Sequence, residues 1–63
     1  MKQYTFKLTN KQTKAYVMDI SVFASSLLVA SRQAARELDR LRKRMYDAGY
    51  SIEHLMDLDA TLR

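Results

Sequence analysis

A helical hydrophobic stripe occupies the middle of this chain, and neither proline nor glycine interrupts it. Its apolar residues recur at spacings of three, four and seven, the period of one helix face: Leu27, Ala34, Leu38, Leu41, Met45 and Ala48. Ser25 or Ser26 can cap its start, and Gly49, the only glycine, stands where a helix would end in a left-handed conformation. The pattern predicts a helix over about 26–48, roughly 34 Å long at a rise of 1.5 Å per residue.

Two segments before this stripe alternate apolar and polar residues with the period of half-buried strands. The polar stretch 10–14 between them suits a turn with a loop of about five residues, and Asn10 can take the left-handed conformation there at a lower cost than most residues. We therefore predict a β-hairpin over residues 3–22. One face of the hairpin would carry Tyr4, Phe6, Leu8, Tyr16, Met18, Ile20 and Val22.

The segment after Gly49 reads as a second, short helix. Ser51 is well placed as its N-cap, and Glu53 favours its first turn. Ile52, Leu55, Met56 and Leu62 share a helical face, which predicts a helix over about 52–62. A strand is the alternative for 51–62, although it would place His54 in the middle of an apolar face. A second alternative makes 26–30 a short third strand, with the long helix starting at Ser31.

These elements predict an α+β fold: an N-terminal β-hairpin packed on a long amphipathic α-helix, followed by a short C-terminal helix. A chain of 63 residues has room for one domain, 1–63, and buries only about 60% of the surface of its unfolded form. Small domains often supplement their core with disulfides, metals or self-association, and zero cysteines remove the first option. We therefore expect a homo-oligomer, most simply a dimer, or ordering on a partner.

The longest uncharged run, residues 20–31, is the only candidate for a membrane or signal segment. A transmembrane helix needs roughly 17 to 25 apolar residues, so this run is too short to span a bilayer. The absence of cysteine fits a reducing compartment. We expect a cytoplasmic protein with no membrane partner.

Four arginines follow one another at intervals of four residues within the predicted helix: Arg32, Arg36, Arg40 and Arg44. Like charges at this spacing repel by a few tenths of a kcal/mol per pair, so this arginine ladder either serves an anionic partner or is neutralised locally. Arg42 and Lys43 would broaden the basic patch, and the lysines at 7, 11 and 14 would extend it from the hairpin. Glu37 and Asp39 stand three residues before Arg40 and Arg42, where they can form intrahelical ion pairs.

Other polar and aromatic residues point to contacts rather than to chemistry. Tyr46 and Tyr50 flank the end of the long helix and are candidates for a protein contact. His54 is the sole histidine, and the serines lack a recognisable base partner. No glycine-rich phosphate loop is present. We expect a non-enzymatic protein with no cofactor and no metal.

The stretch LDRLRKRMYDAGYSIEHLMDL, residues 38–58, resembles a helical pair found in MerR-type transcription regulators. In that pair a basic helix ends in a Gly-aromatic-Ser turn and a second helix follows. The resemblance implies that Gly49, Tyr50 and Ser51 form an interhelical turn. Those regulators read DNA mainly with a preceding helix-turn-helix, where this chain has a predicted hairpin, so the resemblance concerns local structure and not membership of the family.

The leading functional hypothesis is a small regulatory or inhibitory binding protein of the kind encoded by phages and mobile elements. It would dock on a host protein or a protein–nucleic-acid complex through the basic helix. The alternative is a dimeric nucleic-acid-binding protein whose arginine ladder contacts phosphates. A third hypothesis is a structural or assembly subunit that pairs through the hairpin edge. The candidate binding residues are Arg32, Arg36, Arg40, Lys43, Arg44, Tyr46 and Tyr50.

Overall fold

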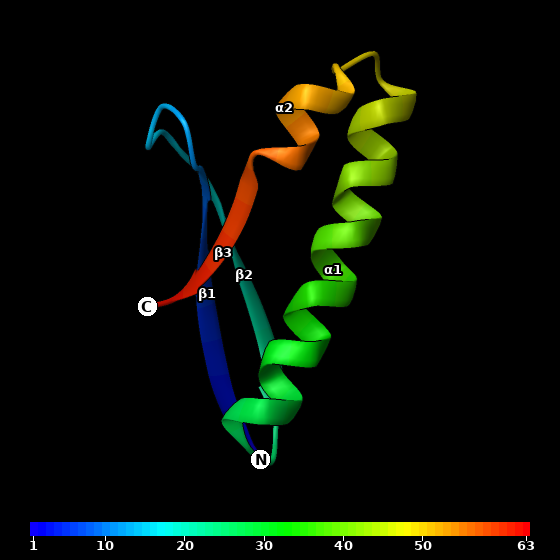
Figure 1. Ribbon diagram of the computed structural model, residues 1–63. Coiled ribbons are helices and arrows are strands. Elements are labelled where there is room, and N and C mark those ends of the chain that lie inside the picture. The colour runs from blue at the N-terminus through cyan, green and yellow to red at the C-terminus, as the bar shows by residue number, and fades with distance from the viewer.

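The computed structural model describes residues 1–63 and contains three strands and two helices (Figure 1). In chain order these are β1 (Lys2–Asn10), β2 (Tyr16–Ala24), α1 (Leu27–Asp47), α2 (Ile52–Met56) and β3 (Leu58–Leu62). The strands form one antiparallel sheet in the order β2-β1-β3, and α1 lies along its β2 side. The α+β prediction of a hairpin, a long helix and a short helix is confirmed.

The hydrophobic core lies between α1 and one face of the sheet. The period of two directs alternate residues of β1 and β2 toward the helix. The side of α1 that faces them carries small residues, which let the helix approach the strands closely. Leu8 and Leu58 are the largest side chains that are fully buried. The core consists of Phe6, Leu8, Ile20, Val22, Ala24, Ala30, Ala34, Leu38, Leu55 and Leu58.

A β-bulge interrupts the hairpin near its loop. Leu8 pairs with Met18, but the next pair is Thr9 with Tyr16, so Val17 has no partner. The extra residue turns Tyr16 to the face of Thr9, away from α1. The Arg63 guanidinium lies over the Tyr16 ring there, 6.0 Å from its centre. The prediction that Tyr16 shares the core face is therefore wrong, because a single inserted residue reverses the alternation.

The hairpin loop has the predicted five residues, 11–15, but a different residue takes the left-handed conformation. The positive φ, 63°, belongs to Lys14. Asn10 stays in the strand, where its amide N–H donates to the Ala15 carbonyl. Its buried side-chain Oδ1 accepts hydrogen bonds from the Gln12 and Thr13 amides at 2.9 and 3.0 Å. Asn10 thus shapes the turn through its side chain.

The predicted long helix is confirmed, and the alternative of a short strand at 26–30 is wrong. Ser26 caps the start of α1, with its Oγ accepting from the Val29 amide at 3.3 Å. At the other end the Gly49 and Tyr50 amides donate back to the carbonyls of Tyr46 and Met45, and Gly49 has a φ of 102°. This is a Schellman motif, which needs the positive φ that glycine allows. Neither helix combines the length and apolar content needed to cross a bilayer.

The predicted second helix is correct at its start and wrong at its end. Ser51 caps α2 through a hydrogen bond from the His54 amide, so residues 49–51 form the expected interhelical turn. However, α2 stops at Met56, and residues 58–62 form β3 beside the Phe6–Asn10 half of β1. Leu58 and Ala60 alternate with Asp59 and Thr61, so a strand directs the two apolar residues to the core. It also pairs an edge of β1 that would otherwise be bare.

Candidate docking groove

A groove of about 580 Å³ runs between α1 and β2, the outer strand of the sheet. Its apolar residues come mostly from the helix-facing side of β2, and Met18 leaves 40% of its surface exposed. Its polar rim comes from successive turns of α1. The lining residues are Met18, Asp19, Ile20, Ser21, Val22, Phe23, Gln33, Arg36, Glu37, Arg40, Leu41 and Arg44.

The arginine ladder winds around α1 and does not run parallel to the helix axis. A step of four residues rotates the side chain by about 40°, so the three steps from Arg32 to Arg44 cover about 120°. The rotation leaves Arg32 outside the groove and brings Arg36, Arg40 and Arg44 to its rim. The structure therefore groups three of the four arginines on one side of the helix, beside β2.

Local neutralisation of the ladder is partial. Arg40 Nη1 lies 2.7 Å from Glu37 Oε1, which is the intrahelical pair expected from the spacing. Arg32, Arg36, Lys43 and Arg44 have no carboxylate oxygen within 4.0 Å. Two of these four cations, Arg36 and Arg44, line the groove. The rim of the groove thus keeps positive charge that no group of the same molecule offsets by direct contact.

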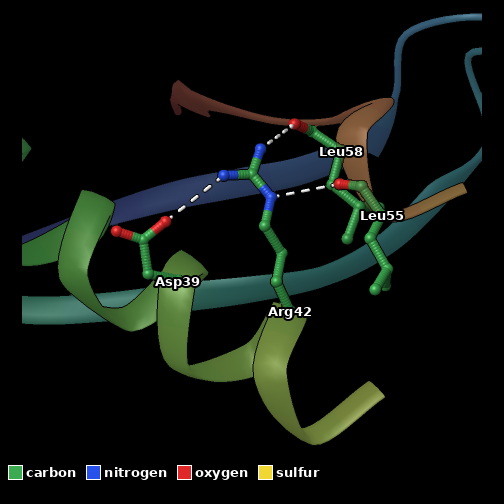
Figure 2. Close-up of polar contacts among 4 residues, drawn as sticks. All are labelled: Asp39, Arg42, Leu55 and Leu58. Atoms are coloured by element: carbon green, nitrogen blue, oxygen red, sulfur yellow. Dashed lines mark hydrogen bonds and ion pairs between the residues drawn. The ribbon is translucent and has the colours of Figure 1, made fainter. Parts of the chain in front are cut away.

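Arg42 does not belong to the outer basic surface, which corrects the interpretation that it broadens the patch. Its guanidinium turns toward the junction of α2 and β3 (Figure 2). Nε donates to the Leu55 carbonyl and Nη2 to the Leu58 carbonyl, both at 3.0 Å, while Nη1 lies 3.3 Å from Asp39 Oδ1. Only 28% of the Arg42 side chain is exposed. Arg42 links the C-terminal third of the chain to α1.

The lysines have different positions relative to the groove. Lys43 joins Glu37, Arg40 and Arg44 around a second, smaller hollow on α1. Lys7 lies between the buried residues Phe6 and Leu8, so it points to the sheet face opposite α1. Lys11 and Lys14 are exposed in the hairpin loop. The sheet therefore separates Lys7 from the arginines that it was expected to join.

The outer edge of β2 presents main-chain groups beside these arginines. The Thr5 carbonyl accepts from the Arg63 amide at 2.9 Å, so the main chain of Thr5 faces the β3 side of β1. Because direction alternates along a strand, Tyr4 and Phe6 face β2, where they pair with Val22 and Ile20. The intervening residues of β2 face away from β1. The unpartnered amides and carbonyls are those of Asp19, Ser21 and Phe23.

The carboxylate of Asp19 is already engaged. Arg63 Nε donates to Asp19 Oδ1 at 3.0 Å, reaching across the sheet face opposite α1. This hydrogen bond raises the pKa of Arg63 above its ordinary value, which reflects how the charged guanidinium is stabilised by Asp19. With Asp19 facing Arg63 and Glu37 facing Arg40, both groove acids have a cationic partner.

The two candidate tyrosines lie outside the groove, near the turn between the helices. Tyr50 stacks on His54 with ring centres 5.6 Å apart and an interplanar angle of 24°. Tyr46, Tyr50, Ile52 and Met56 are each more than half exposed. No cluster of three or more His, Asp or Glu side chains is arranged to hold a metal ion.

Comparison of the chain with protein-family models, with curated proteins and with solved structures finds no match.

Proposed function

We propose that this chain is a small non-enzymatic regulatory or inhibitory protein that docks on a partner protein through the groove between α1 and β2. One observation supports this most strongly: cations without a carboxylate partner stand next to a strand edge without a neighbour. Arg36 and Arg44 supply the charge, and Asp19, Ser21 and Phe23 supply the main-chain groups. An open edge combined with side-chain contacts is a recurring way to recognise polypeptides.

The apolar floor of the groove favours a polypeptide over a phosphate backbone. Nucleic-acid phosphates would use the arginines but would gain little from Met18 or Leu41. A protein segment would use the cations, the apolar floor and the main-chain edge together. It would also cover the exposed part of Met18, whose burial contributes favourable free energy in proportion to the area removed from water.

The second candidate function is a dimeric nucleic-acid-binding protein. Arg32 and Lys43 favour it, because they also lack a carboxylate partner and continue the basic surface outside the groove. Binding to a generic DNA duplex at low salt would then be measurable and would fall steeply as salt rises, with a slope set by the number of phosphates contacted. Sedimentation of the purified chain tests the dimer.

Site-specific photo-crosslinking tests docking through the groove. A photoreactive amino acid at Gln33, on the groove rim, is expected to form a crosslink to a partner in lysate of the source cells. The same group at Gln12, in the exposed hairpin loop, serves as the matched control. The partner identified in this way is then purified, and the crosslink is repeated with two components. Equal crosslinking from Gln12 and Gln33, or none from Gln33, would contradict the proposal.

A further inference from the structure

We infer that the groove binds an extended acidic segment of a partner protein, which adds to β2 as a fourth strand and carries carboxylates at alternate positions. The inference rests on the proposed function and specifies the chemistry of the ligand. It joins two features of the groove: the free main chain of β2 and the row of arginines on α1 that faces it.

The spacing of the arginines matches the spacing of side chains on a strand. Residues four apart on a helix are about 6 Å apart along its axis. Residues two apart on a strand share a face and are about 6.6 to 6.8 Å apart. Over the two steps from Arg36 to Arg44 the mismatch is only about 1 to 2 Å, which long arginine side chains can absorb. Three carboxylates at alternate positions of an added strand would each meet one arginine.

The other face of the added strand meets a different environment. Its intervening side chains would stand on the face of Asp19, Ser21 and Phe23, which is opposite α1. On that face Arg63 is already held by Asp19, and the exposed ring of Phe23 favours apolar or β-branched residues. The groove therefore selects one of the two possible alternations of an acidic strand. A slip by one residue would turn its acids to the opposite face, away from Arg36, Arg40 and Arg44.

A second copy of this chain is a poor occupant of the groove. Pairing two β2 edges would bring two rows of Arg36, Arg40 and Arg44 toward one another, and like charges across an interface are unfavourable. The chain also has no segment with three acids at alternate positions. Both arguments point to a different, acidic polypeptide.

The first experiment uses two synthetic peptides of identical composition. One is Thr-Glu-Val-Glu-Val-Glu-Thr, with alternate acids, and the other is Thr-Val-Glu-Glu-Glu-Val-Thr, with the acids adjacent. At low salt we expect the alternating peptide to bind about five- to tenfold more tightly, because only it can place all three carboxylates beside arginines. Equal affinities would overturn the inferred spacing.

The second experiment tests whether the peptide adds as a strand. N-methylation of the intervening valines and N-methylation of the glutamates remove different sets of main-chain donors, and only one set faces β2. Strand addition predicts that one methylated peptide loses at least tenfold in affinity and the other changes little. Loss on the valines indicates an antiparallel strand and loss on the glutamates a parallel one. Similar losses of affinity for the two methylated peptides would overturn the inference, because charge attraction alone would then explain the binding.

These outcomes are separate from those of the proposed function. If Gln33 crosslinks to a partner but the alternating peptide is not preferred, docking through the groove is supported and the inferred acidic strand is contradicted. Peptide preference without a crosslink from Gln33 would reject the proposed function. If a generic DNA duplex displaces the alternating peptide at physiological salt, a nucleic-acid-binding function would be favoured over docking on a partner protein and over the acidic strand.

Discussion

Arg42 on α1 and Leu55 on α2 are joined by a hydrogen bond from the arginine Nε to the leucine carbonyl, 3.0 Å long, across 13 residues of sequence (Figure 2). The same guanidinium also donates to the Leu58 carbonyl at the start of β3. A helix leaves its last carbonyls without partners, and Arg42 satisfies one at the end of α2. The basic helix thus uses one arginine to hold the fold and presents others at the groove.

Replacing Arg42 with alanine is expected to destabilise the protein by about 2 kcal/mol, because two charge-assisted hydrogen bonds to partly buried carbonyls are lost. In a domain of this size that corresponds to a fall in Tm of about 10 °C. Arg42→Lys should recover only part of the loss, since an ammonium cannot reproduce the planar fork. Thermal unfolding followed by circular dichroism measures both.

The matched control is Arg40→Ala. Arg40 is also paired with an acid three residues earlier, but its side chain is 71% exposed and holds no other element. Exposed pairs contribute little, so we expect a change within about 0.5 kcal/mol. Equal losses for the two arginines would show that Arg42 has no special structural role.

Gly49→Ala is expected to cost about 1 to 2 kcal/mol through backbone strain alone. A Cβ at this position would meet no atom within 4 Å, so no steric clash contributes, but φ is 102°. The chain is short enough for chemical synthesis, which allows D-alanine to be placed there. D-alanine accepts a positive φ and restricts the unfolded chain, so stability should be equal to or above that of the glycine form. A loss with D-alanine as large as with L-alanine would contradict the backbone explanation.

The local hydrophobic pattern is sufficient to predict the hairpin and α1 from the sequence. Period two and period 3.6 are both sustained over many residues there, and Ser26 and Gly49 mark the ends of the long helix. The segment 57–62 is too short for its hydrophobic pattern to distinguish a helix from a strand. Leu62 continues a helical face with Leu55, but it continues a strand face with Leu58. The open half of β1, some 50 residues earlier, selects the strand.

The groove, like β3, is formed by contacts between segments that are far apart in the sequence, so the sequence pattern does not predict it. The ladder of arginines was visible in the sequence, but its position beside β2 follows from where α1 crosses the sheet. The bulge at Val17 has no local signal either, and it reversed the face of Tyr16. Arg42 did have a signal: it lies four residues after the buried Leu38, so it leans toward the core side of α1.

Glu37→Gln is expected to tighten binding of the alternating acidic peptide about two- to fivefold. The change removes a negative charge from the groove rim and frees Arg40, whose Nη1 lies 2.7 Å from Glu37 Oε1. Helix stability should fall by only a few tenths of a kcal/mol. Asp39→Asn is the control, since it changes the net charge equally but lies outside the groove. Isothermal titration of both variants checks the prediction, and an equal gain would indicate a bulk charge effect.

Comparing Arg36→Gln with Arg32→Gln tests docking through the groove most directly. Both residues belong to the ladder on α1, both lack a carboxylate partner, and both variants change the net charge by the same amount. Only Arg36 lines the groove. We predict that Arg36→Gln raises the Kd for the alternating acidic peptide at least fivefold, about 1 kcal/mol, while Arg32→Gln changes it by no more than about twofold. Equal losses in the two variants would contradict the assignment of the groove as the docking site.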